Sequence, residues 1–327
     1  MRFPKYIQQG DTIGVTAPSG GILEKIDSYE SSINQLKNRG FKLYETKNVR
    51  TKGIVSSGAI ERAQQLHELY EKEEVSAIIT ATGGEFLMEM LPFVDYNRIG
   101  KHPKWIQGYS DPTGLLYTIT TKCQIATIYG PNACSYDMSV LHESLENNLN
   151  LLQGKDVIQR SFSRYQSGWG ENSDGYDLDN SVFWDTPNGA VDVEGRLIGG
   201  CLDCLQNLVG TKYDATKQFV EAYQTHGFIW YFDIFSLKAE DVVRSLWQMK
   251  EAGWFQFVKA FIVGRVRFPE SFVGFTYTQA FRQLFPDIPL IMNADIGHVK
   301  PQMTIINGAM GRVRGKDGTG SIQMWEG

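Results

Sequence analysis

The sequence lacks the features of several large classes of protein. The 327-residue chain carries a formal net charge of −5 at pH 7, so it has no basic surplus with which to bind nucleic acid. No apolar run approaches the roughly 20 residues needed to span a bilayer. The N-terminus, Met1 to Tyr6, has neither the apolar core nor the small-residue cleavage site of a signal peptide. We therefore expect a cytoplasmic protein whose partners include neither a membrane nor nucleic acid.

Cysteine is also scarce, and its four positions predict no metal site. Cys123 and Cys134 stand apart, while Cys201 and Cys204 form a C-x-x-C pair of a kind that can bind zinc or carry redox chemistry. Neither a second pair nor a neighbouring pair of histidines completes a zinc site. We expect buried, reduced cysteines and no metal or other cofactor. A thiol at a helix N-terminus can have a lowered pKa, which would make Cys201 reactive.

The sequence instead has the composition of a globular protein with a regular alternation of strands and helices. Hydrophobic residues make up 42% of the chain and charged residues 21%, which is typical of a protein with a substantial core. In the first half, short apolar runs alternate with stretches of helical periodicity, which predicts an α/β fold with a mainly parallel, covered sheet. We expect strands at 12–18, 41–44, 77–82, 104–107 and 125–129, and helices at 26–36, 59–72 and after Pro112.

The residue composition changes in the middle of the chain. Ser, Gly, Asn and Asp dominate the segment 161–188, where no period persists, and such a stretch usually marks a linker or a functional loop. Trp169 and Trp184 lie in it, where they could stack on a ligand or pack the loop onto the body. A second pattern of strands and helices begins near 195–200, where Gly199-Gly200 is expected to be a turn opening a helix. We predict an N-terminal α/β domain at 1–160, a linker or loop at 161–190 and a C-terminal β/α domain at 191–327.

Ser110 is the best candidate for a nucleophile, because it follows an apolar strand and precedes a helix start at Asp111-Pro112. A serine on a tight strand-to-helix turn is held where a substrate carbonyl can reach it. Asp111 is expected to cap the helix, and its backbone N–H would point towards an oxyanion formed near Ser110. The N–H of Gly84, in the Gly83-Gly84 turn after another strand, is the second expected donor. The alternative interpretation is a plain capping turn.

Two distant residues complete a set for nucleophilic catalysis. His298 follows Gly297 at the end of a strand, and an imidazole that titrates near neutral pH suits the base that activates a serine. Asp233 ends an apolar strand, and a hydrogen bond to the His298 ring N–H would satisfy its carboxylate and select the tautomer needed for base catalysis. Glu240 and Asp241 are rivals, expected on the solvated face of the next helix. These residues predict acyl transfer.

Six short segments across nearly the whole chain carry a resemblance to a known family, in the family's order: 10–19, 82–84, 108–111, 195–200, the strand that ends at Asp233, and 297–298. In these segments the chain resembles the LD-carboxypeptidase family of serine peptidases, which includes muramoyltetrapeptide carboxypeptidases and peptidases of microcin C self-immunity. The resemblance implies a flavodoxin-like N-terminal domain, a swivelling C-terminal β/α domain, a site between them, and a homodimer.

The family's catalytic triad is Ser–Glu–His. The resemblance places the nucleophile at Ser110, the base at His298, the acid at Asp233 and the oxyanion donors at Gly84 and Asp111. Asp233 departs from the family's glutamate and is one methylene shorter, so either its strand sits closer to the histidine or another acid serves. Cys201 also stands where many members have asparagine after the glycine pair.

The resemblance implies the substrate as well. It points to hydrolysis of the bond between an L-centre and a terminal D-amino acid, with release of D-alanine from a cytoplasmic murein tetrapeptide during wall recycling. One alternative is an amidase of aminoacyl or peptidyl nucleotides, for which Trp169 or Trp184 would stack on the base. Another is a non-catalytic muropeptide binder. A general α/β-hydrolase esterase fits the residue order, but Pro112 in place of the elbow's second glycine and the lack of an HGGG-like segment argue against it.

Overall fold

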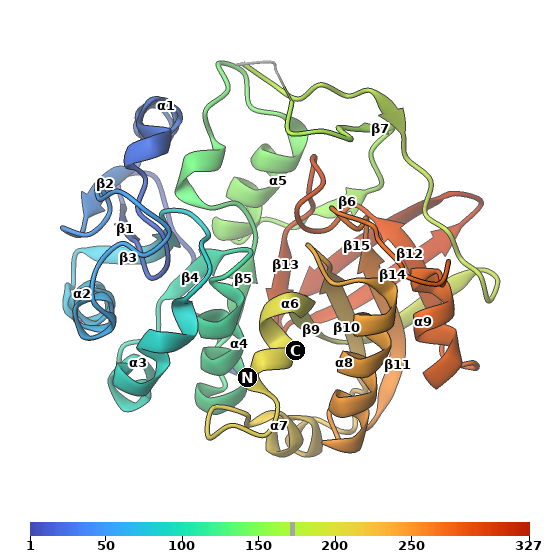
Figure 1. Ribbon diagram of the computed structural model, residues 1–327. Coiled ribbons are helices and arrows are strands. Elements are labelled where there is room, and N and C mark those ends of the chain that lie inside the picture. Colours follow the sequence, from blue (N-terminus) through green and yellow to red (C-terminus); the bar gives the residue numbers. More distant parts are fainter. Residues whose placement is uncertain (171–173) are drawn as a thin grey trace. The chain divides into compact units, whose positions relative to one another are not determined.

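The computed structural model describes residues 1–170 and 174–327, and the chain divides into two compact units (Figure 1). Among the described residues, unit 1 contains Met1–Asp156 with 174–175, and unit 2 contains 157–170 and Tyr176–Gly327. The expected loop at 161–190 therefore falls mainly within unit 2, where it carries two short paired strands. In the described part of the chain, no helix combines the length and the apolar character that crossing a membrane requires.

Unit 1 is an alternation of strands and helices, drawn from blue to green in Figure 1. Its strands are β1 (Thr12–Thr16), β2 (Lys42–Glu45), β3 (Val75–Thr80), β4 (Trp105–Gly108) and β5 (Thr127–Tyr129). Its helices are α1 (Ile26–Asn38), α2 (Ala59–Glu71), α3 (Tyr96–Lys101), α4 (Thr113–Cys123) and α5 (Glu143–Leu152), with 3-10 turns η1 (Leu23–Lys25), η2 (Leu87–Phe93) and η3 (Ala133–Ser135).

The strands of unit 1 pair in parallel in the order β2-β1-β3-β4-β5. This order is that of flavodoxin-like folds, which confirms the expected architecture. Strand β3 is buried almost throughout, as strands are in a parallel sheet that is covered on both faces. Helix α2 packs on β1 and β3, and α4 packs on β4 and β5. The carboxyl ends of β1, β3, β4 and β5 meet at one edge of this sheet.

Unit 2, drawn from yellow-green to red in Figure 1, is built on a mixed sheet. Its strands are β6 (Ile158–Arg160), β7 (Arg164–Tyr165), β8 (Asn180–Ser181), β9 (Val191–Cys201), β10 (Phe228–Asp233), β11 (Val258–Gly264), β12 (Leu290–Ala294), β13 (Ile305–Asn307), β14 (Met310–Lys316) and β15 (Thr319–Trp325). Its helices are α6 (Leu202–Leu205), α7 (Thr216–Ala222), α8 (Ala239–Glu251) and α9 (Tyr277–Leu284), with the 3-10 turn η4 (Gln206–Leu208).

Seven strands of unit 2 lie in the order β12-β11-β10-β9-β14-β15-β6. The first four are parallel, and β14, β15 and β6 add antiparallel pairs. The expected turn at Gly199-Gly200 is wrong, since both glycines lie inside β9. The close approach of β10 explains Gly199, because a Cβ there would lie 1.9 Å from the Tyr231 carbonyl oxygen. The strand ends at Cys201, which precedes the single turn of α6.

Candidate functional site

Ser110 lies at the carboxyl end of β4 in a strained turn. Its φ is +69°, a left-handed conformation that costs a residue with a side chain about 1–3 kcal/mol and is concentrated at functional sites. The next residues enter α4 directly, since the Thr113 N–H donates to the Ser110 carbonyl oxygen at 2.9 Å. The serine is half-buried. These are the features of a serine held out on a strand-to-helix turn.

Asn132, which follows β5, holds this turn in place. Its Oδ1 accepts from the Tyr109 N–H at 3.2 Å and from Thr80 Oγ1 at 2.6 Å. Gly108 is required beside them, because a Cβ there would lie 2.2 Å from Thr80 Oγ1. Asn132 is not among the residues predicted from the sequence, although a polar residue shortly after a strand of a parallel sheet falls at the edge where sites form. It fixes the backbone on which Ser110 is carried.

The Gly83-Gly84 turn lies next to Ser110, as expected. A Cβ on Gly83 would lie 3.1 Å from both Cβ and Oγ of the serine, and a Cβ on Gly84 would lie 2.2 Å from Ser19 Oγ. Only glycine therefore fits at position 84. Within the described ranges, the backbone N–H groups of Gly84 and Asp111 donate no hydrogen bond to another group.

The carboxylate of Asp111 differs from the expectation that it caps the helix. The N-cap residue of α4 is Pro112, and no side chain caps this helix. Asp111 instead accepts from the Leu87 N–H at 2.8 Å and from the hydroxyl of the buried Ser19. Burial raises the pKa of the Asp111 carboxyl, and these two hydrogen bonds and the charge of Arg62 oppose that rise. The carboxylate thus ties the ends of β1 and β4 together.

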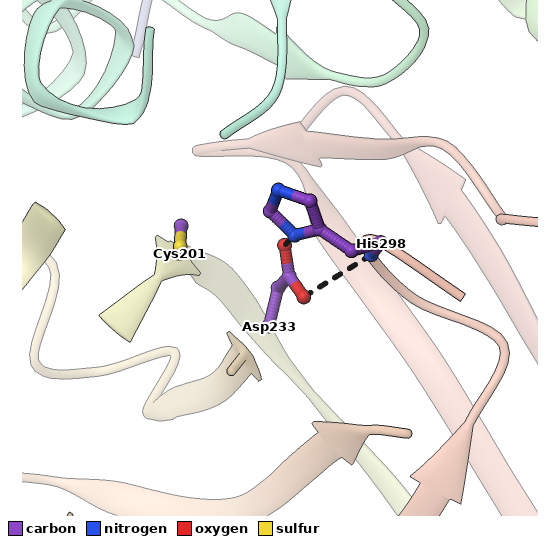
Figure 2. A group of neighbouring side chains, drawn as sticks. All are labelled: Cys201, Asp233 and His298. Atoms are coloured by element: carbon purple, nitrogen blue, oxygen red, sulfur yellow. Dashed lines mark hydrogen bonds and ion pairs between the residues drawn. The ribbon is translucent and has the colours of Figure 1, made fainter. Parts of the chain in front are cut away.

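Asp233 and His298 form a buried pair in unit 2 (Figure 2). Asp233 Oδ2 lies 2.6 Å from His298 Nδ1, and its Oδ1 accepts the His298 backbone N–H at 3.2 Å. The carboxylate has no exposed surface, and the imidazole is 8% exposed. The ring of Phe235 packs against the imidazole with centroids 4.5 Å apart. The carboxylate therefore contacts the Nδ1 side of the ring and fixes its orientation.

Gly297 makes this short contact possible. Its φ is +90°, and a Cβ there would lie 2.0 Å from Cγ and Oδ1 of Asp233. Because Gly297 has no side chain, the turn lies close enough to β10 for the Asp233 carboxylate to reach the imidazole of His298. The two rival acids are engaged elsewhere, since Glu240 Oε1 accepts from the Phe272 N–H at 3.0 Å and Asp241 pairs with Arg244. Asp233 therefore contacts His298 without the longer side chain of the family's glutamate.

The C-x-x-C pair lies beside this carboxylate. The four cysteines form no disulfide, as expected, but the expected burial holds only for Cys201, which is 2% exposed; Cys123, Cys134 and Cys204 are partly exposed. A hydrogen bond with Cys204 and burial raise the pKa of the Cys201 thiol, which is the opposite of the lowered pKa considered from its place before a helix. Ligand atoms of Cys201, Asp233 and His298 lie within 4.8 Å of one another.

The two tryptophans of the 161–190 segment have different surroundings. Trp184 has no exposed surface, and its indole N–H donates to Asp295 Oδ2 at 2.9 Å, so it offers a ligand no face and packs the core of unit 2. Trp169 is 72% exposed. The guanidinium of Arg267 lies over its ring, 4.1 Å from the centroid, and the Phe268 ring lies 6.0 Å away. Of these two tryptophans, Trp169 is the one that presents an aromatic face for stacking.

Comparisons with known proteins match both halves of the chain to one family. The profile of the LD-carboxypeptidase N-terminal domain matches residues 13–130, and that of the LD-carboxypeptidase C-terminal domain matches residues 194–313. The chain therefore belongs to the LD-carboxypeptidase family.

Three relatives show how the chain compares within that family. The microcin C7 self-immunity protein of Escherichia coli is 30% identical over 62% of this chain and 62% of its own length. A murein tetrapeptide carboxypeptidase of Pseudomonas aeruginosa is 26% identical over 61% of this chain and 60% of its own length. The crystal structure of a protein from Bacillus anthracis that is similar to the microcin self-immunity protein superposes with a TM-score of 0.85, at 23% identity over 100% of both chains, which bears on the fold alone.

Proposed function

We propose that this protein is a serine-type LD-carboxypeptidase that releases terminal D-alanine from a murein tetrapeptide in the cytoplasm. The contact of 2.6 Å between Asp233 and His298 carries the proposal, because an oriented neutral imidazole is the base that a serine nucleophile requires. The left-handed Ser110, on its tight turn, is the matching nucleophile. The proposal requires the two units to present Ser110 and the imidazole to the same scissile bond. We extend it to a homodimer, which light scattering can measure.

The reaction follows from the roles of these groups. His298 takes the proton of Ser110 Oγ as the oxygen attacks the carbonyl of the L-residue, and Asp233 stabilises the imidazolium that forms. The C–N bond then breaks, and the imidazolium gives its proton to the amine of the departing D-alanine. Water, deprotonated by His298, attacks the ester on Ser110. The acyl product leaves as a carboxylate, and the serine regains its proton.

The negative charge on the carbonyl oxygen needs donors during both attacks. The N–H groups of Gly84 and Asp111 are the proposed pair, since a Cβ on the preceding Gly83 would lie 3.1 Å from Ser110 Oγ and Asp111 follows the serine directly. Loss of one such donor typically lowers turnover about 10²–10³-fold. The Asp111 carboxylate would act only by positioning, through its hydrogen bonds to Ser19 and Leu87.

Release of D-alanine from a murein tetrapeptide tests the proposal. Ser110→Ala should lower kcat by about 10⁴–10⁶-fold, because the covalent intermediate can no longer form. Ser135→Ala is the matched control, since Ser135 is also half-buried in unit 1, and it should keep the activity of the parent. Equal turnover by Ser110→Ala and the parent would overturn the assignment of the nucleophile.

Covalent labelling tests whether His298 serves Ser110. A fluorophosphonate probe should label the parent at Ser110, and mass spectrometry of the modified peptide identifies the residue. His298→Gln should label far more slowly, because the serine then lacks its base. His142→Gln is the control, since His142 lies in unit 1 at the N-cap of α5. Equal labelling of His298→Gln and the parent would show that the two residues do not act together.

A second candidate function is hydrolysis of the amide in an aminoacyl or peptidyl nucleotide. The exposed ring of Trp169, with the Arg267 guanidinium over one face, favours it, because a tryptophan face can stack on a base. Incubation with an aminoacyl sulfamoyl adenosine, followed by detection of the free amino acid, separates the two activities. Release from this compound alone would replace the tetrapeptide as the substrate. Binding of a muropeptide without turnover of either compound would identify a non-catalytic binder.

A further inference from the structure

The C-x-x-C pair lies next to the Asp233–His298 pair, a proximity that the sequence alone did not indicate. Cys201 ends β9 and Asp233 ends β10, and the two residues are register partners in parallel strands. Partners at the same register direct their side chains to the same face of a sheet. Figure 2 shows Cys201 beside the carboxylate on which the imidazole rests, and ligand atoms of the three residues lie within 4.8 Å of one another. One thiol, one carboxylate and one imidazole therefore converge.

These three groups, with a second thiol, make up a donor set that zinc binds. Zinc takes thiolate sulfur, imidazole nitrogen and carboxylate oxygen in tetrahedral sites, with bonds of about 2.0–2.3 Å that place neighbouring ligand atoms about 3.5 Å apart. The carboxylate oxygen and the imidazole nitrogen, now 2.6 Å apart, would have to separate by about 1 Å, and the Cys201 sulfur, within 4.8 Å of both, would have to approach them by no more than about 1 Å. Cys204, half-exposed and hydrogen-bonded to Cys201, can supply the fourth ligand.

We propose that Cys201, Asp233 and His298, with Cys204 as the fourth ligand, bind a thiophilic divalent cation of the zinc class, and that this cation switches the hydrolase off. The binding site stands on the geometry of unit 2 alone, whereas the switch rests on the proposed function. An occupied site draws the Asp233 carboxylate away from the imidazole and takes one ring nitrogen of His298. The base then lacks its orienting acid and its normal proton exchange.

Binding exchanges protons for the cation. The metal–sulfur bonds form as each thiol loses its proton to solvent, and the neutral imidazole keeps one proton on the ring nitrogen that the cation does not take. The Cys201 thiol is surrounded by Cys204 and Asp203 of α6 and by Asp233 of β10. Binding of the cation therefore releases protons to solvent.

Cobalt(II) is the direct probe of the site, because thiolate coordination gives a charge-transfer band in the near ultraviolet that can be titrated. The parent protein should bind one equivalent of Co²⁺ with this band, and Zn²⁺ should displace it. Cys201→Ser should weaken binding at least about tenfold and diminish the band. Cys204→Ser should diminish the band as well, which gives a second variant if the buried substitution perturbs folding. Cys123→Ser, in unit 1, is the control and should behave as the parent does.

Activity is compared with and without Zn²⁺ for each variant, so that a change in metal-free activity does not affect the readout. The parent should lose activity with Zn²⁺ and regain it with a chelator, whereas Cys201→Ser should keep most of its own activity at the same concentration. Absence of the cobalt–thiolate band in the parent, or an undiminished band in Cys201→Ser, would overturn the site. A band in a protein that hydrolyses neither compound would leave the site standing and refute the proposed function.

Discussion

Gly297 offers the sharpest test of how the Asp233–His298 pair is assembled. Replacement by alanine adds a Cβ 2.0 Å from Cγ and Oδ1 of Asp233, whereas ordinary van der Waals contact begins at 3.4 Å. The turn or the carboxylate must therefore move by more than 1 Å. Either movement breaks the contact of 2.6 Å with His298. We expect Gly297→Ala to disconnect the acid from the base while both residues remain.

The magnitude has a backbone part and a functional part. The φ of +90° costs alanine about 1–2 kcal/mol, and the stiffer unfolded chain returns about 0.4–1 kcal/mol, so the backbone alone should lower stability by about 1 kcal/mol. The functional loss is larger. An imidazole without its orienting acid loses up to about 10⁴ in turnover, which corresponds to about 5 kcal/mol of transition-state stabilisation.

Gly189→Ala is the matched control for the assay. Gly189 has a φ of +91° in the same unit, and a Cβ there meets nothing within 4 Å. The control shares the backbone cost and lacks the collision, so its kcat for D-alanine release should match that of the parent. Thermal unfolding of both variants reports the shared cost. Equal kcat for Gly297→Ala and Gly189→Ala would refute the argument that the glycine sets the distance between acid and base.

Three further changes test other parts of the structure. Asp233→Glu inserts a methylene where the carboxylate already touches the imidazole, so D-alanine release should fall at least about tenfold; unchanged release would mean that the turn readily adjusts. Asn132→Ala removes the acceptor of the Tyr109 N–H, and urea unfolding should show a loss of about 1–3 kcal/mol with a lower kcat; a change in stability alone would contradict its positioning role. Burial lowers the pKa of His67, whose Nε2 accepts the Asp95 N–H. The unfolded chain then binds the proton first on acidification, so the free energy of unfolding should fall between about pH 7 and pH 5, and His67→Gln should reduce that fall in urea titrations at both pH values.

Much of the fold could be predicted because strands and helices repeat at fixed spacing. The buried strands of unit 1 are short apolar runs, and each expected strand there overlaps an observed one. The antiparallel β14 was not predicted, because Met310–Lys316 alternates arginine with small and apolar residues and its pairing with β9 joins distant segments. Gly199-Gly200 suggested a turn, whereas both residues serve the close packing of β9 on β10. Local pattern does not distinguish a glycine in a turn from one beneath a neighbouring backbone.

Part of the candidate site could be predicted because the sequence indicates where the strands end. Strand ends identify residues at the edge of a sheet, which is the reason for proposing Ser110, Asp233 and His298. The sequence could not show which carboxylate contacts His298, because the spacing of residues along the chain gives no distance; in the structure Asp233 lies 2.6 Å from the imidazole. Asp111 shows the limit of a local rule, since its carboxylate bonds Ser19 in a distant segment of the chain instead of capping its own helix. Contacts with distant segments, which the local sequence does not reveal, determine that the Asp111 carboxylate bonds Ser19 and Leu87 and does not cap α4.

The shorter acid and the glycine turn depend on each other. Asp233 can reach the imidazole only if the turn at Gly297, which carries His298, lies close to its strand. The turn can lie this close because residue 297 has no Cβ. The backbone N–H of His298 then bonds the second carboxylate oxygen, so the acid orients both the ring and the chain that carries it. This double contact fixes a carboxylate that has no exposed surface, where an unpaired charge would be costly. It follows that the proposed acid, although one methylene shorter than the glutamate that the resemblance implies, can orient the imidazole through the close turn at Gly297.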